Sequence, residues 1–543
     1  MQLPKISYRA GILIILLLTV SAYAPCINRF ALYDDGWVIA DQRTGSLSNI
    51  PNLFFDQYWA GDKVTKLYRP LTLVLFALER NLFADQVAWL HLMTLLFHLA
   101  TVVLTVLFIK KMTNSGVISL AAGTWFALHP IHTEVVSSLT GVSELGATLF
   151  VLAALSVNYN KHSRAWLAGL LLLVAMLFKE SAAAGIILLF LMRAYQEWSV
   201  NKRVGWETIR FMIPSSLGVL LILLLRHWVL GSIAPANAGQ MLWGMKLSDR
   251  ISFIGLAFFK HFVLLIAPFH LRIDYQGYLM NMPFSIRWAK AIAAFAFIIG
   301  ITWCALKTKN RTKAVSFGWL FLLFAYLPVS NLVPIGVVVA ERLMYLPSIG
   351  ASVLFGVIIE KVGNSKWKSA GAWLLVIGVM ISFIAITYSR CMVWANPDQF
   401  WNRALLDSPN NHLILAHAGI HAMNFGSHEK AAPLLKKACI AQPGNEAVCF
   451  FAGKELYLLK RYQESLAVLA RLTKRQTRET GAVYLVMARA LEKMGNPEAA
   501  KEQALLALER NPALKGIIND WACELAEPAK SIIGCDLKTV KNN

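Results

Sequence analysis

Apolar runs long enough to cross a bilayer recur along this chain from residue 11 to about residue 389. A membrane-spanning helix needs about 20 mostly apolar residues, with a range of about 17–25. Hydrophobic residues make up 57% of the 543 residues and charged residues only 15%, which lies outside the usual balance of soluble proteins. The sequence therefore predicts an all-α, polytopic membrane domain.

The net charge of +21 arises from basic residues in short clusters between the apolar runs, such as Lys110-Lys111 and Lys202-Arg203. Loops on the cytoplasmic side of membrane proteins are rich in Lys and Arg, so these clusters orient the spans. We interpret the charge in this way and predict no nucleic-acid partner. Near the N-terminus, Ala22-Tyr23-Ala24 imitates a signal-peptidase site, but Pro25 directly after it argues against cleavage. The first span is therefore predicted to stay, with its N-terminus inside.

These charges place eleven spans. They are residues 11–31, 88–109, 115–131, 139–157, 165–179, 181–197, 208–230, 288–306, 315–333, 344–360 and 370–389. The run at 252–271 is predicted to be an interfacial or re-entrant helix, because Lys260, His261 and His270 interrupt it and the charges leave no room for another crossing.

From about residue 395 the composition becomes soluble and helix-rich, with an internal period. Ala418-Gly419, Ala452-Gly453 and Met487-Ala488 recur at 34 and 35 residues. A helix-turn-helix repeat of this length is typical of tetratricopeptide arrays, whose concave face holds peptide or protein. We predict a membrane domain at 1–394 and about three repeats at 395–543, on the outer side. The alternative is that the repeats only cap the membrane domain.

The seven cysteines form no C-x-x-C pair, so their spacing gives no zinc or redox motif. Four lie in the C-terminal part: Cys439, Cys449, Cys523 and Cys535. Disulfides are expected there if this part is exported, and free thiols are the alternative. Spacing alone does not decide the pairing.

Polar residues collect on the predicted outer side of the membrane domain. They are Asp34, Asp35, Arg69, His129, His132, Glu134, Glu144, Lys179, Glu180, Glu341 and Arg342. Ionisable residues beside spans are costly and mark functional sites by default. Singly, each has a simpler explanation: Arg69 could extend to a lipid headgroup, and Lys179-Glu180 could be one self-neutralising pair. Jointly they predict a cavity at the outer membrane surface.

The residue types indicate a chemistry. A carboxylate such as Asp34 or Asp35 can accept the proton of an attacking hydroxyl. Arginines can bind a leaving phosphate through paired hydrogen bonds. No G-x-x-x-x-G-K-[ST] or G-x-G-x-x-G motif stands in a strand context, so a soluble nucleotide donor is not indicated. A lipid-linked phosphate donor fits the location better.

An ordered series of motifs resembles a known family. It comprises Asn28-Arg29-Phe30, Asp34-Asp35-Gly36-Trp37, Tyr68-Arg69-Pro70, His129-Pro130-Ile131-His132-Thr133-Glu134, Phe178-Lys179-Glu180 and Glu341-Arg342-Leu343-Met344-Tyr345, followed by the repeats. This series resembles the transmembrane and tetratricopeptide repeat-containing O-mannosyltransferases and their bacterial relatives. The resemblance covers nearly the whole chain.

The resemblance implies a GT-C glycosyltransferase fold that uses a polyprenyl-phosphate sugar, with inversion and transfer to a Ser or Thr hydroxyl of an exported protein. It also implies that Asp34 and Asp35 form the catalytic acidic pair. We expect Asp34 to be the base and Arg342, supported by Arg69 or Lys179, to bind the donor phosphate. The supporting residues are expected to be His129, His132, Glu134, Glu180 and Glu341, together with Asp35.

Several alternatives stay open at this stage. The acceptor could be lipid A or a surface polysaccharide, and the sugar is not fixed by any visible residue. A divalent metal on Asp34 and Asp35 is an alternative with few ligands to support it. The chain could also be a non-enzymatic scaffold that recruits partners through its repeats. The predicted location is the inner (cytoplasmic) membrane, with site and repeats on the periplasmic side.

Overall fold

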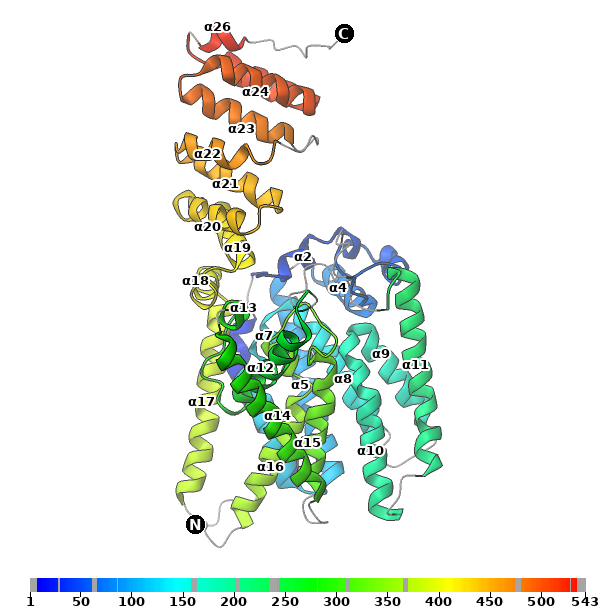
Figure 1. Ribbon diagram of the computed structural model, residues 1–543. Coiled ribbons are helices and arrows are strands. Elements are labelled where there is room, and N and C mark those ends of the chain that lie inside the picture. The colour runs from blue at the N-terminus through cyan, green and yellow to red at the C-terminus, as the bar shows by residue number, and fades with distance from the viewer. Residues whose placement is uncertain are drawn as a thin grey trace. The chain divides into compact units, whose positions relative to one another are not determined.

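The structure is a computed structural model. It describes residues 7–27, 30–60, 66–84, 86–157, 164–201, 205–233, 242, 244–280, 282–307, 313–364, 370–473, 480–527 and 529–534. All regular structure in these ranges is helical, so the all-α prediction is confirmed (Figure 1). Asn28-Arg29, Lys202-Arg203 and Cys535 lie outside the described residues.

The chain divides into two compact units within α18 (Pro397–Asp407), between Phe400 and Trp401. The first unit is Met1–Tyr275 with Leu279–Phe400, and the second is Trp401–Asn543 with Gln276–Tyr278. The predicted boundary at residue 394 lies six residues before this division. Each unit is described by itself.

Each predicted span of the first unit falls on one helix. These helices are α1 (Tyr8–Tyr23), α5 (Val87–Thr113), α6 (Gly116–Leu128), α8 (Val142–Val157), α9 (Ala165–Phe178), α10 (Ala184–Asn201), α11 (Trp206–Leu230), α14 (Phe284–Lys307), α15 (Lys313–Tyr326), α16 (Ser348–Asn364) and α17 (Ala370–Trp394). Within the described residues, six helical stretches are long and apolar enough to cross a membrane. The protein is therefore a multi-pass membrane protein.

Three of these helices have fewer than 15 residues. α6, α9 and α15 have 13, 14 and 14 residues. At about 1.5 Å per residue they reach only about 20 Å. They end before His129-Pro130, Lys179-Glu180 and Leu327-Pro328, where a proline or charged side chains interrupt the apolar run. These irregular ends carry several of the predicted site residues, and non-helical backbone at this depth is tolerated where protein surrounds it.

Small residues let the spans approach closely. A Cβ on Gly318 of α15 would lie 2.9 Å from the Gly350 carbonyl oxygen of α16. A Cβ on Gly356 of α16 would lie 2.5 Å from the Ile118 carbonyl oxygen of α6. Contacts of this kind replace the hydrophobic driving force, which is absent between helices in lipid.

The segment between α1 and α5, which is predicted to lie on the outer side and is called the first outer segment, folds into short helices. These are α2 (Asp35–Ala40), α3 (Ile50–Leu53) and α4 (Pro70–Phe83). Their core contains Leu53, Tyr58 and Phe76, and it packs against Val142 at the start of α8. Arg43 holds the intervening loop: its guanidinium pairs with Asp41 and Asp56 and donates to the Tyr58 carbonyl oxygen at 2.9 Å.

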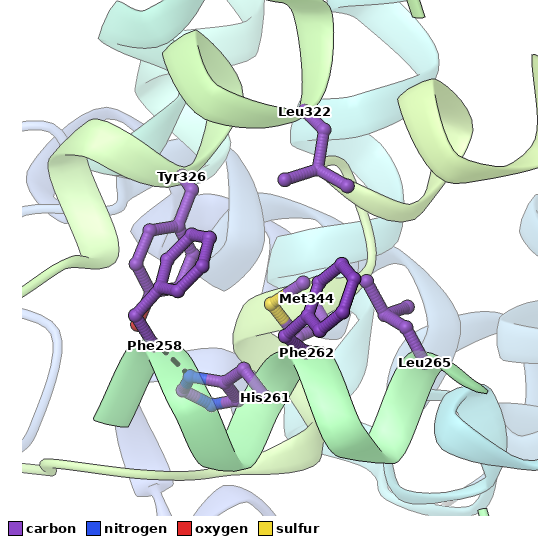
Figure 2. A pocket seen from close by; sticks show the side chains of 7 residues that line it. All are labelled: Phe258, His261, Phe262, Leu265, Leu322, Tyr326 and Met344. Carbon is purple, nitrogen blue, oxygen red and sulfur yellow. Dashed lines mark hydrogen bonds between the residues drawn. The ribbon is translucent and has the colours of Figure 1, made fainter. Parts of the chain in front are cut away.

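Helix α12 (Leu247–Ile266) covers the run that was predicted to be interfacial or re-entrant, and it packs against α14. His261, one of the polar residues behind that prediction, is buried. Its Nδ1 lies 3.0 Å from the Tyr326 hydroxyl (Figure 2). Its Nε2 lies 3.1 Å from the Ala340 carbonyl oxygen. The His261 side chain thus connects α12 to α15 and to Ala340, the residue before Glu341. The position of α12 in the membrane stays a prediction.

The second unit consists of helix hairpins. The first helices of the hairpins, α19 (His412–Asn424), α21 (Glu446–Leu458) and α23 (Thr480–Lys493), begin 34 residues apart. They pack against α20 (His428–Ala441), α22 (Tyr462–Leu469) and α24 (Pro497–Arg510). A Cβ on Gly419 would lie 2.7 Å from Leu435, which explains a glycine at this repeated position. The hairpins fit the predicted period; their assignment as tetratricopeptide repeats stays a prediction.

Cysteines form one disulfide in each unit. Cys26 after α1 pairs with Cys391 of α17, and Cys439 of α20 pairs with Cys449 of α21. The second pair involves two of the four C-terminal cysteines, and it joins consecutive hairpins.

The Cys439–Cys449 disulfide is expected to stabilise the second unit. Loop-closure entropy for ten residues predicts that Cys439→Ser costs about 2–3 kcal/mol of unfolding free energy. Thermal unfolding of the full chain, with and without reductant, measures this difference. Cys523→Ser, outside the pair, is the control. A Cys439→Ser protein that unfolds at the wild-type temperature would show that the disulfide does not form.

Candidate functional site

Asp35 is the first residue of α2 and is buried. Its Oδ1 accepts hydrogen bonds from the Ser138 hydroxyl at 2.7 Å and the Thr140 backbone N–H at 3.1 Å. Oδ2 has no partner among the described residues. Burial raises the pKa of Asp35 to about 7, against the lowering effect of these hydrogen bonds. Asp35 is therefore a fixed carboxyl group that anchors the acidic pair to the loop before α8.

Asp34 caps α2 and is half-buried, so it is the more accessible carboxylate of the pair. The preceding residue, Tyr33, has a φ of 55°, a left-handed conformation that is uncommon for a non-glycine residue. The charges of Asp34 and Arg342 both act on the Tyr33 hydroxyl, whose pKa is raised mainly by burial. The structure thus places Asp34 and Arg342 within electrostatic reach of the same side chain, although 308 residues separate them in the sequence.

Arg342 is held by Glu134. The Arg342 guanidinium pairs with Oε1 of Glu134, and its backbone N–H donates to Oε2 at 2.9 Å. Nearby carboxylates, Glu134 first and then Asp34, raise the pKa of Arg342 despite its burial cost. The Arg342 side chain is still 31% exposed, more than Arg69 at 14% or Lys179 at 10%. Arg342 is therefore the most accessible of the three predicted phosphate-binding cations.

Glu341, the residue before Arg342, is completely buried. One of its oxygens accepts from the Tyr275 hydroxyl and the Arg272 N–H, both at 2.9 Å, and the other pairs with Arg390 at 2.9 Å. Burial raises the pKa of Glu341 to about 7. These contacts fix the turn that carries Arg342, so Glu341 helps to position that residue.

The second group of charges differs from the prediction. Lys179 pairs with Glu144, whereas Glu180 accepts two hydrogen bonds from Arg69, at 2.7 and 3.0 Å. Lys179 and Glu180 are therefore not one self-neutralising pair. Lys179 has extended backbone, with φ −158° and ψ 137°, and in extended backbone neighbouring side chains point to opposite sides. Arg69 likewise does not simply extend to a headgroup, and its charge lowers the pKa of Glu180 to about 2 against the effect of burial.

Tyr58 connects the two groups, and sequence reasoning missed it. The Arg69 guanidinium lies 5.2 Å from the centre of the Tyr58 ring. The charges of Arg69, Asp34 and Asp35 all act on its buried hydroxyl. Ser138 and Arg390 were missed as well. No local pattern marks these three residues, because each acquires its role through a contact with a distant segment.

His129 and His132 are buried and are bound to fixed partners. His129 Nε2 lies 3.1 Å from the Leu265 carbonyl oxygen. His132 lies 2.9 Å from both the Phe126 carbonyl oxygen and the Ser348 hydroxyl. Both histidines therefore connect the end of α6 to other helices, and their predicted support of the site is positional.

The cavity in Figure 2 is not this site. It lies between α12, α15 and Met344, its lining is apolar except for His261 and Tyr326, and it leaves no room for a water-sized molecule. Ligand pockets are usually about 300–1,000 Å³. Among the described residues, no three His, Cys, Asp or Glu side chains are grouped to hold a metal ion. The two carboxylates of Asp34 and Asp35 do not fit a metal site, because one Asp35 oxygen already accepts from Ser138 and Thr140.

The raised pKa of Asp35 predicts a pH dependence of stability. The folded protein keeps this proton up to about pH 7, whereas the unfolded chain loses it near 3.8. The protonated Asp35 therefore contributes to the unfolding free energy at low pH, and this contribution is lost as the pH rises from about 3.8 to about 7. Asp35→Asn keeps a hydrogen-bonding oxygen but cannot ionise, so it should flatten the fall by up to about 4 kcal/mol.

Thermal unfolding in detergent between pH 5 and pH 8 measures this effect. Glu341 is present in both proteins, so the slope is reduced and not abolished. Asp398→Asn, at an exposed position, should keep the wild-type slope. An Asp35→Asn protein with the wild-type slope would contradict the assignment.

Fold and site together define a multi-pass helical membrane protein with paired carboxylates and arginines at the irregular ends of its spans. No family model matches the chain. It is 24% identical over 433 residues to "Protein O-mannosyl-transferase F38B6.6" of Caenorhabditis elegans, covering 75% of this chain and 59% of that protein. It is 25% identical to "Protein O-mannosyl-transferase TMTC3" of Mus musculus (83% and 53% covered) and of Homo sapiens (80% and 52%).

These similarities confirm the predicted resemblance to this group of transferases. The chain spans between about half and three fifths of the length of these curated relatives. A solved structure, ArnT from Cupriavidus metallidurans bound to undecaprenyl phosphate, is 14% identical with a TM-score of 0.34, covering 96% of this chain and 80% of that chain. A TM-score this low does not establish a shared fold, so the GT-C fold stays a prediction.

Proposed function

We propose that this protein is a membrane glycosyltransferase that moves a sugar from a polyprenyl-phosphate donor to a hydroxyl acceptor. The observation that carries the proposal is the placement of a half-buried carboxylate, Asp34, within the electrostatic reach of a partly exposed guanidinium, Arg342. A displacement at an anomeric carbon needs a base on one side and stabilisation of the departing phosphate on the other. The sugar transferase activity of the similar proteins supports the same reaction class.

In the proposed step, the acceptor oxygen forms a bond to the anomeric carbon while the bond from that carbon to the phosphate oxygen breaks. The acceptor proton passes to Asp34, and the bonding electrons leave with the lipid phosphate. Attack from the face opposite the leaving group inverts the configuration, and no covalent intermediate is needed. Asp35, held by Ser138 and Thr140, fixes the backbone of the pair.

Arg342 is proposed to stabilise the negative charge that develops on the lipid phosphate. Glu134 holds this guanidinium through two hydrogen bonds, so it needs little reorganisation when charge develops. Arg69 is proposed to support it from the side of Tyr58, while Lys179 is engaged by Glu144. Histidines 129 and 132 and Glu341 keep the surrounding turns in place.

The disulfides support the proposed location of the site. Cys26–Cys391 joins the ends of α1 and α17, and Cys26 precedes Asp34 by only eight residues. Disulfides persist in oxidising compartments such as the bacterial periplasm. The Cys439–Cys449 pair gives the same argument for the second unit. We therefore propose that site and helical hairpins both face the periplasmic side of the inner membrane.

The acceptor is proposed to be a Ser or Thr of an exported protein. The concave face of the helical repeat array is proposed to hold that protein. Mass spectrometry of exported proteins from cells with and without this protein tests the proposal. A mass shift that depends on the protein identifies sugar and acceptor together. A shift on lipid A or polysaccharide instead would identify the alternative acceptor, and unchanged glycans with a correctly inserted protein would favour the scaffold.

A further inference from the structure

Arg226, one turn before the end of α11, is a buried cation for which the described part of the chain offers no carboxylate partner. Two arginines in the described part of the chain are only 4% exposed, Arg193 and Arg226. Arg193 lies 3.9 Å from a carboxylate oxygen of Glu197. Arg226 donates from Nη2 to the neutral carbonyl oxygen of Lys66 at 2.7 Å, and its Nε has no partner among the described residues.

Arg226 lies beside the Arg69–Glu180 pair, since the charges of both residues act on it. Glu180 already binds Nε and Nη2 of Arg69, and Glu144 is engaged by Lys179. Among the described residues, this corner therefore holds three cations (Arg69, Lys179 and Arg226) and two carboxylates (Glu144 and Glu180). A buried charge without compensation costs several kcal/mol. The corner between α4, α9 and α11 thus has one positive charge that an anion would neutralise.

Aromatic side chains indicate the depth of this corner. Trp228, two residues after Arg226, is 70% exposed, and Phe55 of the first outer segment is 59% exposed. Their rings contact each other at 5.4 Å, edge to face. Exposed tryptophans at the ends of spanning helices mark the level of lipid headgroups. Figure 1 shows the end of α11 next to this outer segment. Arg226 therefore lies at the depth of lipid phosphates.

We propose that Arg226, together with Arg69, binds the phosphate of a lipid headgroup that enters from the bilayer beside α11. The chemistry is that of a phosphate held by paired guanidinium groups. Two lipids can supply it: a polyprenyl phosphate, or a bulk anionic phospholipid. The site shares Arg69 with the proposed donor site and in that respect rests on the proposed function, but lipid binding at Arg226 does not require sugar transfer.

The test measures lipid binding to the purified full chain in detergent. Undecaprenyl phosphate or phosphatidylglycerol is titrated, and the melting temperature reports binding. Arg226→Met should weaken binding of the recognised lipid about 10-fold or more, because a charged hydrogen bond is lost. Arg226→Lys should retain part of it. Arg210→Met, exposed at the other end of the same helix, should bind as the wild type does.

A second readout separates anion binding from a structural role. An arginine that only held the Lys66 carbonyl would lower the melting temperature of the lipid-free protein when it is removed. An uncompensated buried cation should leave that temperature unchanged or raise it when it is replaced by Met. If Arg226→Met does not fold, the affinity of Arg226→Lys decides in its place.

The outcomes are distinct. If binding of undecaprenyl phosphate depends on Arg226, the site is supported and its ligand is the polyprenyl lipid. If only binding of phosphatidylglycerol depends on Arg226, the site is supported and its ligand is a bulk phospholipid. Affinities of both lipids within about twofold of wild type in every variant that folds would overturn the proposal. A wild-type protein that binds lipid through Arg226 but transfers no sugar would overturn the proposed function and leave this site intact.

Discussion

Asp34→Asn is expected to lower sugar transfer about 1,000-fold, because a general base contributes about 10²–10⁴ to a rate. The amide keeps the size of the side chain but cannot accept the acceptor proton. Membrane insertion and lipid binding should be unchanged, since the amide is isosteric with the half-buried carboxylate. Transfer from a synthetic polyprenyl-phosphate sugar by the purified protein measures the effect.

Two companion variants make this result interpretable. Asp398→Asn, at an exposed position of α18, makes the same chemical change away from the site and should keep full activity. Asp35→Asn should reduce transfer less than Asp34→Asn, because the Asp35 carboxyl is buried and held by Ser138 and Thr140. The opposite order would assign the base to Asp35.

Arg342→Gln is expected to lower kcat about 100- to 1,000-fold, the usual effect of removing a group that stabilises developing negative charge. The loss should appear in kcat more than in KM, since the charge on the phosphate grows in the transition state. Arg342→Lys keeps the charge but loses the planar fork that pairs with Glu134 and phosphate, so an intermediate loss is expected. Stopped-assay kinetics with varied donor concentration measure both constants.

The pairing with Glu134 gives a further check on this assignment. Glu134→Gln and Arg342→Gln should be strongly non-additive, because each removes the same contact. Arg164 is exposed at the N-terminal end of α9, away from Lys179, and Arg164→Gln should leave kcat unchanged. A kcat for Arg342→Gln within about threefold of wild type would exclude Arg342 as the phosphate-stabilising residue and would leave Arg69 as the candidate.

The positions of the spans and the helical repeats were predictable because both depend on local composition. A run of about 20 apolar residues is restricted to helix by the bilayer itself. The 34-residue period follows from small residues at the points where paired helices touch, as Gly419 touches Leu435. The early ends of α6 and α15 were less visible, because apolar residues continue past the proline that follows each helix.

The partners of the charged residues were not predictable. Neighbours in sequence, Lys179 and Glu180, turn to different partners, Glu144 and Arg69. Glu134 meets Arg342 across 208 residues. Hydropathy and motif spacing contain no information about such contacts, since these depend on how the irregular ends of separate helices come together.

The acidic pair shows the division most clearly. By itself the sequence determined that Asp34 and Asp35 follow the first span, that a polytopic helical domain surrounds them, and that helix hairpins follow it. Only the tertiary structure decided that Asp35 is buried against Ser138, that the charge of Asp34 acts on Arg342, and that Arg226 is buried where the described residues offer it no carboxylate partner. The physical reason is that helix formation in a membrane is dictated within each segment, whereas burial and charge pairing depend on segments far apart in the chain.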